Sequence, residues 1–98
     1  MFINIIKTYR DVVAVCDSEL LGKYFEEGNS QLDIKESFYK GRETSEKETI
    51  ILMRDMAIED ATFNIVGRES TTAALKARII SKDQIGEIDG IPFALILI

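Results

Sequence analysis

The chain begins with two apolar segments that predict an antiparallel pair of strands. Residues 2–9 mix isoleucines with polar residues, which is typical of a half-exposed strand, and residues 12–16 read VVAVC, apolar on both faces. The next residues, DSELLGK, predict a short helix that Asp17 or Ser18 caps and Gly22 ends. We therefore expect the chain to pass from a buried strand directly into a helix N-terminus.

The middle of the chain predicts a short strand and a first amphipathic helix. Residues 32–34 indicate the strand, in a stretch whose apolar residues are otherwise too widely spaced for an element. Ser45 and Glu48 then have the S-x-x-E spacing of a capping box, in which each side chain accepts a hydrogen bond from the other residue's backbone N–H. The apolar stripe that follows predicts a helix to about Ala57, packed on a sheet.

A further strand and a second helix come next. Residues 61–66 alternate small or polar residues with apolar ones, which favours a short strand, with a helical turn as the alternative. Gly67 breaks this pattern. Residues 68–80 place alanines and an isoleucine on one helical face, so we expect a second amphipathic helix there.

The last segment has the clearest local signal. A D-G pair at positions 89–90, between two apolar runs, is typical of a β-hairpin with a type I′ turn. Pro92 lacks an N–H, so the start of the final strand has one side at an edge or a bulge. Residues 93–98 read FALILI without a polar side chain. We expect this strand to be buried on both faces, in the sheet centre or against another subunit.

The register of this hairpin leaves residues 95–98 without a partner strand, because a two-residue turn pairs residues 85–88 with residues 91–94 only. We expect the overhang to pair with the first strands of the chain, with a homodimer through the C-terminal strand as the alternative. Together the elements predict a single α+β domain over residues 1–98. Its two layers are a mostly antiparallel sheet and two main helices packed on one face.

Composition and charge narrow the classes of function. The chain has 98 residues with no His and one Cys, which excludes His-based catalysis, zinc sites that use His and an internal disulfide, and we expect no cofactor. Its 12 Lys and Arg against 17 Asp and Glu give a net charge of −5, which disfavours strong nonspecific DNA binding. No leader pattern and no apolar run of about 18 to 20 residues is present, so we expect a cytoplasmic protein without a membrane partner.

Two chemically interesting side chains meet at the predicted strand-to-helix junction. Helix N–H groups there would lower the pKa of Cys16, yet no His is present as a base, and a buried structural thiol is the favoured interpretation. Asp17 is a candidate binding residue, because a carboxylate at this junction can cap the helix, bind a cation or pair with Lys23. Capping is favoured, because a site for a hard cation needs several converging oxygens.

The stretch of residues 35–42 mixes basic and aromatic residues with a glycine. Phe38, Tyr39, Lys40 and Arg42 have the composition that contacts phosphates and stacked bases in RNA-binding proteins. The structural alternative, in which the aromatic side chains anchor a loop to the core, is the commoner one for a small domain.

A third candidate site combines Asn64, Gly67 and Arg68. An amide, free helix N–H groups and a cation can hold an anion. In the structural alternative, Asn64 bonds a neighbouring loop and Gly67 supplies a positive φ. These residues also allow a different class of function, a small enzyme or ligand-binding protein with a pocket around Asp17, Lys23 and Asn64.

Four strings in this order, VAVCDSELLGKYFEEG, LDIKESFYKG, ATFNIVG and IGEIDGIPFA, resemble the small archaeal family named domain of unknown function 424. The resemblance covers nearly the whole chain. The positions that match the family pattern are Asp17, Leu20, Leu21, Gly22, Lys23, Phe38, Tyr39, Gly41, Asn64, Gly67, Gly90 and Pro92. Family members often have a pattern similar to PHAQ at the last strand, whereas this chain reads PFAL, so a mechanism that uses a shared His is doubtful.

The resemblance implies an archaeal cytosolic α+β domain that is linked by broad association to RNA handling or translation. Because no complete catalytic set is present, our leading hypothesis is a non-catalytic binding module rather than an enzyme. It would contact RNA or a ribonucleoprotein through residues 35–42 and the turns at residues 22–23 and 64–67. A structural homodimer or a subunit of a complex is the other alternative.

Overall fold

The computed structural model describes residues 1–97, which fold around a six-stranded sheet of strand order β5-β1-β2-β6-β8-β7. The strands are β1 (Phe2–Ile6), β2 (Val12–Cys16), β3 (Tyr24–Glu27), β4 (Ser30–Asp33), β5 (Arg42–Glu43), β6 (Thr62–Val66), β7 (Gly86–Ile88) and β8 (Ile91–Ile96). The helices are η1 (Ser18–Leu20), α1 (Glu36–Tyr39), α2 (Glu46–Ile58), α3 (Arg68–Lys76) and η2 (Lys82–Gln84).

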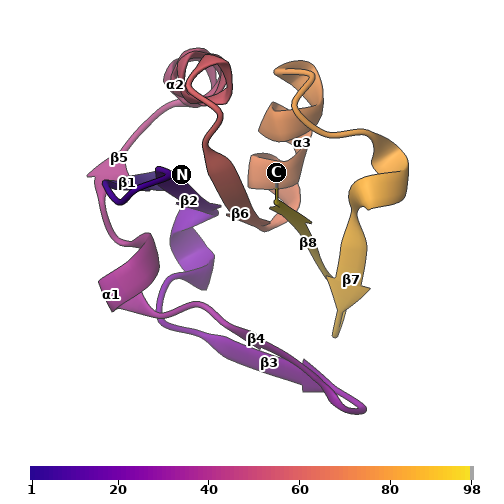
Figure 1. Cartoon of the computed structure of the whole chain (residues 1–98). Helices are drawn as coiled ribbons and strands as arrows, with labels where there is room; N and C mark the ends of the chain where they lie inside the picture. The colour runs from indigo at the N-terminus through magenta and orange to yellow at the C-terminus, as the bar shows by residue number, and fades with distance from the viewer. Residues whose placement is uncertain (98) are drawn as a thin grey trace.

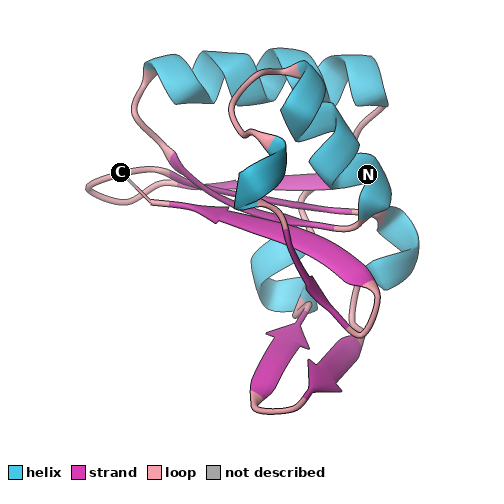
Figure 2. Ribbon diagram, turned by 90° about the vertical axis from the view of Figure 1, so that its right-hand side faces the viewer, coloured by secondary structure: helices cyan, strands magenta, loops and turns pink. Residues whose placement is uncertain are grey.

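Two layers of different size cover the two faces of the sheet (Figures 1 and 2). Helices α2 and α3 lie together on one face, here called the helix face. The separate β3–β4 hairpin and the short α1 lie beneath the opposite face, here called the hairpin face. Four of the five strand pairs in the sheet are antiparallel and one, β2 with β6, is parallel. The prediction of an α+β fold with two main helices on one face of a mostly antiparallel sheet is confirmed.

The two predicted N-terminal strands pair as expected, with Phe2 opposite Cys16 and Ile6 opposite Val12. The parallel pairing of β2 with β6 requires a crossover, because the chain must return to the same end of the sheet before β6 begins. Residues 17–61 make this crossover and hold the hairpin, α1, β5 and α2. The strand expected around residues 32–34 is β4, which begins two residues earlier, ends one residue earlier and pairs with β3.

Helix α2 begins with the predicted capping box: the Glu48 N–H donates to Ser45 Oγ, and the Ser45 N–H donates to Glu48 Oε1, each at 3.2 Å. Helix α3 ends at Lys76 rather than at residue 80. The reason is the left-handed backbone of Arg78, whose φ of 63° is incompatible with a continuing helix.

The core has one cluster on each face of the sheet. The helix-face cluster is built by side chains from β2, β6, α2 and α3, with small alanines that let α3 approach the sheet: Val13, Val15, Phe63, Ile65, Met53, Met56, Ala73, Ala74 and Ala77. The hairpin-face cluster is smaller and joins the end of the sheet to the hairpin and α1: Ala14, Cys16, Val66, Leu20, Leu32, Ile34, Tyr39 and Ile88. Among residues 1–97, no helix has the length and apolarity that spanning a membrane requires.

The C-terminal hairpin has the predicted turn, but its last strand is placed differently. Asp89 and Gly90 have φ values of 51° and 78°, as a type I′ turn requires. The overhang of β8 pairs with β6, with Leu95 opposite Asn64, so the expected pairing with the first strands is wrong. The reason is the order of the sheet, in which β2 and β6 lie between β1 and β8.

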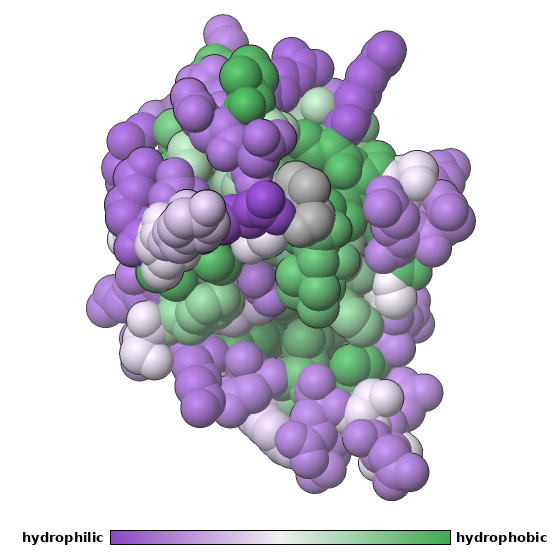
Figure 3. All heavy atoms as spheres, in the orientation of Figure 1, coloured by the Kyte–Doolittle hydropathy of each residue, from purple (hydrophilic) through white to green (hydrophobic). Residues whose placement is uncertain are grey.

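Within a single chain the last strand is not buried on both faces, so the expectation of burial in the sheet centre is wrong, whereas burial against another subunit stays a prediction. Ala94 packs on the helix face, but Leu95 and Leu97, on the hairpin face, are 53% and 71% exposed. The cause is the size of the hairpin-face layer, which covers only the end of the sheet where Cys16 and Val66 lie. Figure 3 shows apolar side chains gathered in the open between the C-terminal strand and the hairpin. Ile98 lies outside the described residues.

Candidate functional site

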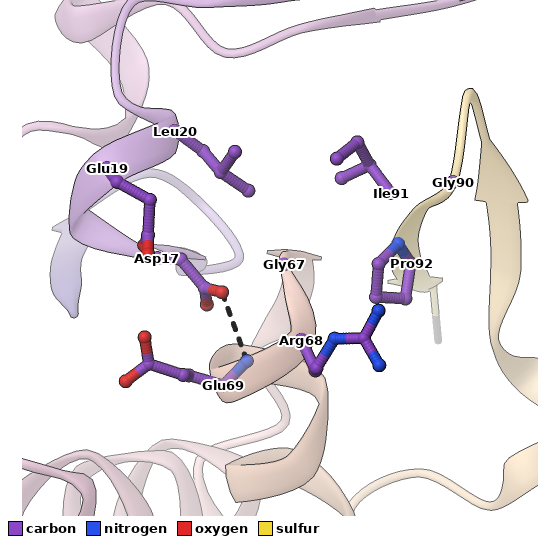
Figure 4. A pocket seen from close by; sticks show the side chains of 9 residues that line it. All are labelled: Asp17, Glu19, Leu20, Gly67, Arg68, Glu69, Gly90, Ile91 and Pro92. Carbon is purple, nitrogen blue, oxygen red and sulfur yellow. Dashed lines mark hydrogen bonds between the residues drawn. The ribbon is translucent and has the colours of Figure 1, made fainter.

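A hollow of about 280 Å³ opens at the end of the sheet where β2 and β6 finish (Figure 4). Three segments far apart in the sequence form its walls: η1, the N-terminus of α3 and the turn between β7 and β8. Its lining residues are Asp17, Glu19, Leu20, Gly67, Arg68, Glu69, Gly90, Ile91 and Pro92. The apolar side chains of Leu20 and Ile91 point toward each other across it.

Asp17 lies at the back of this hollow and is only 4% exposed. Its Oδ2 accepts a hydrogen bond from the Glu69 N–H at 3.0 Å, and its Oδ1 accepts from the Ser70 N–H at 2.8 Å and from Ser70 Oγ at 2.7 Å. The carboxylate therefore caps α3, and its charge sits at the positive end of that helix. The expectation that Asp17 caps the short helix directly after it is wrong: the side chain makes no capping bond to η1.

Gly67 makes this remote cap possible. It occupies the N-cap position of α3 without a side chain to offer, so the first N–H groups of the helix need an acceptor from elsewhere. Its φ of 109° and ψ of 160° belong to a region that only glycine occupies readily. A Cβ at this position would lie 2.5 Å from both carboxylate oxygens of Asp17. The Gly67 N–H donates to the Pro92 carbonyl at 2.8 Å, which fixes the helix start to β8.

The charges around the hollow are acidic on one side and basic on the other. Carboxylate oxygens of Asp17, Glu19 and Glu69 lie within 4.8 Å of one another, and Figure 4 shows the Arg68 guanidinium on the opposite side of the hollow. Asp17 already accepts three hydrogen bonds, so its oxygens serve the helix rather than a cation. An anion at the same helix end would meet Glu19 and Glu69 and would compete with Asp17 for the N–H donors.

The predicted sites around Asn64 and Lys23 are not brought together with Asp17. Asn64 projects from β6 on the hairpin face and lines a second hollow of about 170 Å³ with Tyr39, Phe93 and Leu95 among its walls. Gly67 and Arg68 line the first hollow instead. Lys23 is exposed beside η1, and its backbone bonds Leu20 and Ile34.

The basic and aromatic stretch of residues 35–42 is divided between core and surface. Tyr39 is 6% exposed and belongs to the hairpin-face cluster, and Phe38 packs edge-on against it at 5.0 Å between ring centroids. Lys40 Nζ lies 3.9 Å from Glu36 Oε1, and Arg42 Nη2 lies 3.4 Å from Glu48 Oε2. The rings therefore serve as core anchors, and carboxylates accompany both cations.

Cys16 is fully buried at the end of β2, and its environment suppresses reactivity. Burial, followed by the charge of Asp17 beside it, raises the pKa of the thiol from 9.0 to about 11. Because the thiolate is the nucleophilic form, Cys16 stays protonated and unreactive near neutral pH. The structural interpretation of this residue fits its surroundings.

This pKa shift predicts a loss of stability in alkali. Above pH 9.0 the unfolded chain releases the thiol proton, whereas the folded chain holds it to about pH 11. The stability that the Cys16 shift contributes is therefore fully present below pH 9, and it falls by about 1.4 kcal/mol per pH unit between these two values. Urea unfolding measured at intervals from neutral pH upward tests this. Cys16→Ala should remove much of the decline, and an equal slope in the variant would contradict the assignment.

Two residues of the α3 cap were missed by the sequence analysis. Ser70 donates from both its backbone and its hydroxyl to Asp17, and Thr71 Oγ1 donates to the Gly67 carbonyl at 2.8 Å. The only local hint was that Gly67, at the helix start, offers no side-chain oxygen to the first N–H groups, and this does not say where their acceptor lies.

Comparison with known proteins bears on the fold and the family of the chain. No curated protein matches the chain. A crystal structure of an uncharacterized conserved protein from Methanopyrus kandleri is similar, with a TM-score of 0.86 and 26% sequence identity over 97% of this chain and 88% of that one. The model of the family described as Protein of unknown function (DUF424) matches residues 6–98. The chain therefore belongs to the DUF424 family.

Proposed function

We propose that this chain is a non-catalytic, cytoplasmic binding module that holds an extended segment of polypeptide along β8. The observation that carries the proposal is the exposure of Leu95 and Leu97, 53% and 71%, on a strand that pairs with the sheet. Residues 91–97 have no charged side chain. Contiguous exposed apolar surface of this kind marks protein contact sites.

The surface beside these leucines contains a hollow that can receive a side chain of a partner. The hollow of about 170 Å³ under β6 and β8 has room for a single side chain of a partner, and apolar groups such as Phe93 and Leu32 form most of its wall. Asn64 is half-buried in it, and within residues 1–97 its amide has no hydrogen-bond partner. A free amide in an apolar hollow can bond a peptide group and so fix the register of a bound segment.

A polypeptide fits this surface better than a nucleic acid does. The net charge of −5 repels phosphates, and the nearby aromatic ring of Tyr39 is buried rather than available for base stacking. The cations Lys40 and Arg42 lie close to carboxylates. Binding of RNA at this surface would therefore contradict the proposed function.

A photoreactive benzoylphenylalanine in place of Leu95 tests this function in native cytosol. We expect an adduct that protease removes and nuclease does not, because the side chain lies against a bound polypeptide. The matched control is the same substitution at Ile58, which is 79% exposed at the end of α2. Equal labelling from both positions, a nuclease-sensitive adduct, or no adduct would each contradict the proposal.

A further inference from the structure

We infer that the segment held along β8 is the β8 strand of a second copy of this chain, paired antiparallel about a two-fold axis. This inference rests on the proposed function, and it names the partner. The result would be one continuous sheet through both copies, with the six-stranded order of each copy joined at its C-terminal strand.

The first ground is an uncovered strand edge. On its inner side β8 pairs with β6 over Phe93–Ile96. On its outer side it pairs with β7 only as far as Phe93, because β7 is three residues long. In the described part of the chain, no strand pairs with the outer edge of residues 94–96. Backbone N–H and C=O groups along such an edge are a template for another strand.

The opposite edge of the sheet does not offer the same template. There β5 covers β1 at Phe2 and Ile3, and the chain at Gly41 then packs directly against the strand. A Cβ at Gly41 would lie 2.8 Å from the Cα of Asn4, so no strand can be inserted at that point. This contact blocks the opposite edge at Asn4, whereas no comparable contact lies against Ala94–Ile96 in the described part of the chain.

The second ground is that β8 is complementary to itself. Antiparallel pairing centred on Leu95 places Ala94 of each copy opposite Ile96 of the other, so side chains that pack on the helix face stay on one face. The two Leu95 side chains then meet on the hairpin face and shield each other from water. Residues 91–97 are uncharged. None of the charged side chains that give each copy its net charge of −5 therefore lies in the contact.

The size of the contact sets its strength. Three residue pairs, with one leucine per copy, bury much less than the roughly 800 Å² per partner of a standard interface. We therefore expect a reversible dimer whose fraction rises over about 5 to 500 µM protein.

Sedimentation equilibrium of the intact chain over this concentration range is the test. The wild-type mass should rise from one chain toward two. Leu95→Lys should raise the dissociation constant at least 10-fold, because it places two like charges at the two-fold axis. The matched control, Ile58→Lys, adds the same charge on α2 and should dimerise as the wild type does. Thermal unfolding of each variant verifies that it is folded.

A second variant tests the register. Leu95→Cys should form a disulfide between two copies under mild oxidation, since the two residues oppose each other at the axis. Ile58→Cys should not, and the buried Cys16 does not compete. A wild type that stays monomeric throughout, or Leu95→Lys that dimerises unchanged, would overturn the inference. A monomeric chain whose Leu95 position still labels a different protein would overturn the second copy as partner and leave the binding function standing.

Discussion

Replacing Asp17 by Ala is expected to lower the free energy of unfolding by about 3 kcal/mol, close to one third of the stability of a typical small domain. The substitution removes three hydrogen bonds at once and leaves the N–H groups of Glu69 and Ser70 without an acceptor. It also removes a negative charge from the positive end of α3. Urea unfolding followed by far-ultraviolet circular dichroism measures the loss.

Two further variants separate this cap from general damage at the junction. Asp17→Asn keeps the shape and one acceptor oxygen but loses the charge, so we expect about half the effect. Ser18→Ala changes the next residue, whose hydroxyl bonds the exposed Glu43 at 3.2 Å, and should cost less than about 0.5 kcal/mol. If Asp17→Ala were as mild as Ser18→Ala, the carboxylate would not be the cap of α3.

The parts of this fold that the sequence predicts are those with short-range physical causes. The capping box of Ser45 and Glu48 spans three residues, and the type I′ turn of Asp89 and Gly90 spans two. In each case the residues that determine the geometry are neighbours in the chain. Helix α2, the last hairpin and, through them, the α+β class could therefore be read without coordinates.

The cap of α3 could not be assigned in this way, although Asp17 and Gly67 were both candidate site residues. Asp17 precedes η1, and a local rule assigns it to that helix, but the donors it bonds are 52 and 53 residues further on. Only the parallel pairing of β2 with β6 brings Cys16 beside Val66, and so Asp17 to the start of α3. Strand order, which a single sequence does not reveal, decided the role of the residue.

The exposure of β8 has a similar explanation. An uncharged strand usually indicates burial on both faces, but burial also needs a layer to cover each face. The hairpin and α1 are too small to reach Leu95 and Leu97. The mismatch between an apolar strand and its open surroundings is what points to a partner, because isolated exposed leucines on a polar strand would have no such meaning.

Gly67→Ala is expected to destabilise the chain by about 4 kcal/mol, through two separable effects. The φ of 109° and ψ of 160° strain any residue with a Cβ by about 1 to 3 kcal/mol. The added methyl group would also lie 2.5 Å from both Asp17 oxygens, so the cap must move or break. Gly28→Ala is the matched control: its φ is 60°, nothing lies within 4 Å of a Cβ there, and about 1 kcal/mol of strain is expected.

A double-mutant cycle distinguishes the contact from the backbone strain. In an Asp17→Ala background the methyl group at position 67 meets no carboxylate, so only the strain remains. The combined loss in Asp17→Ala/Gly67→Ala should then be smaller than the sum of the single losses by about 1 to 2 kcal/mol. Additive losses would mean that Gly67 acts through its backbone alone. A combined loss smaller than the sum would mean that the Asp17 carboxylate, which joins the end of β2 to α3, needs a residue without a side chain at position 67.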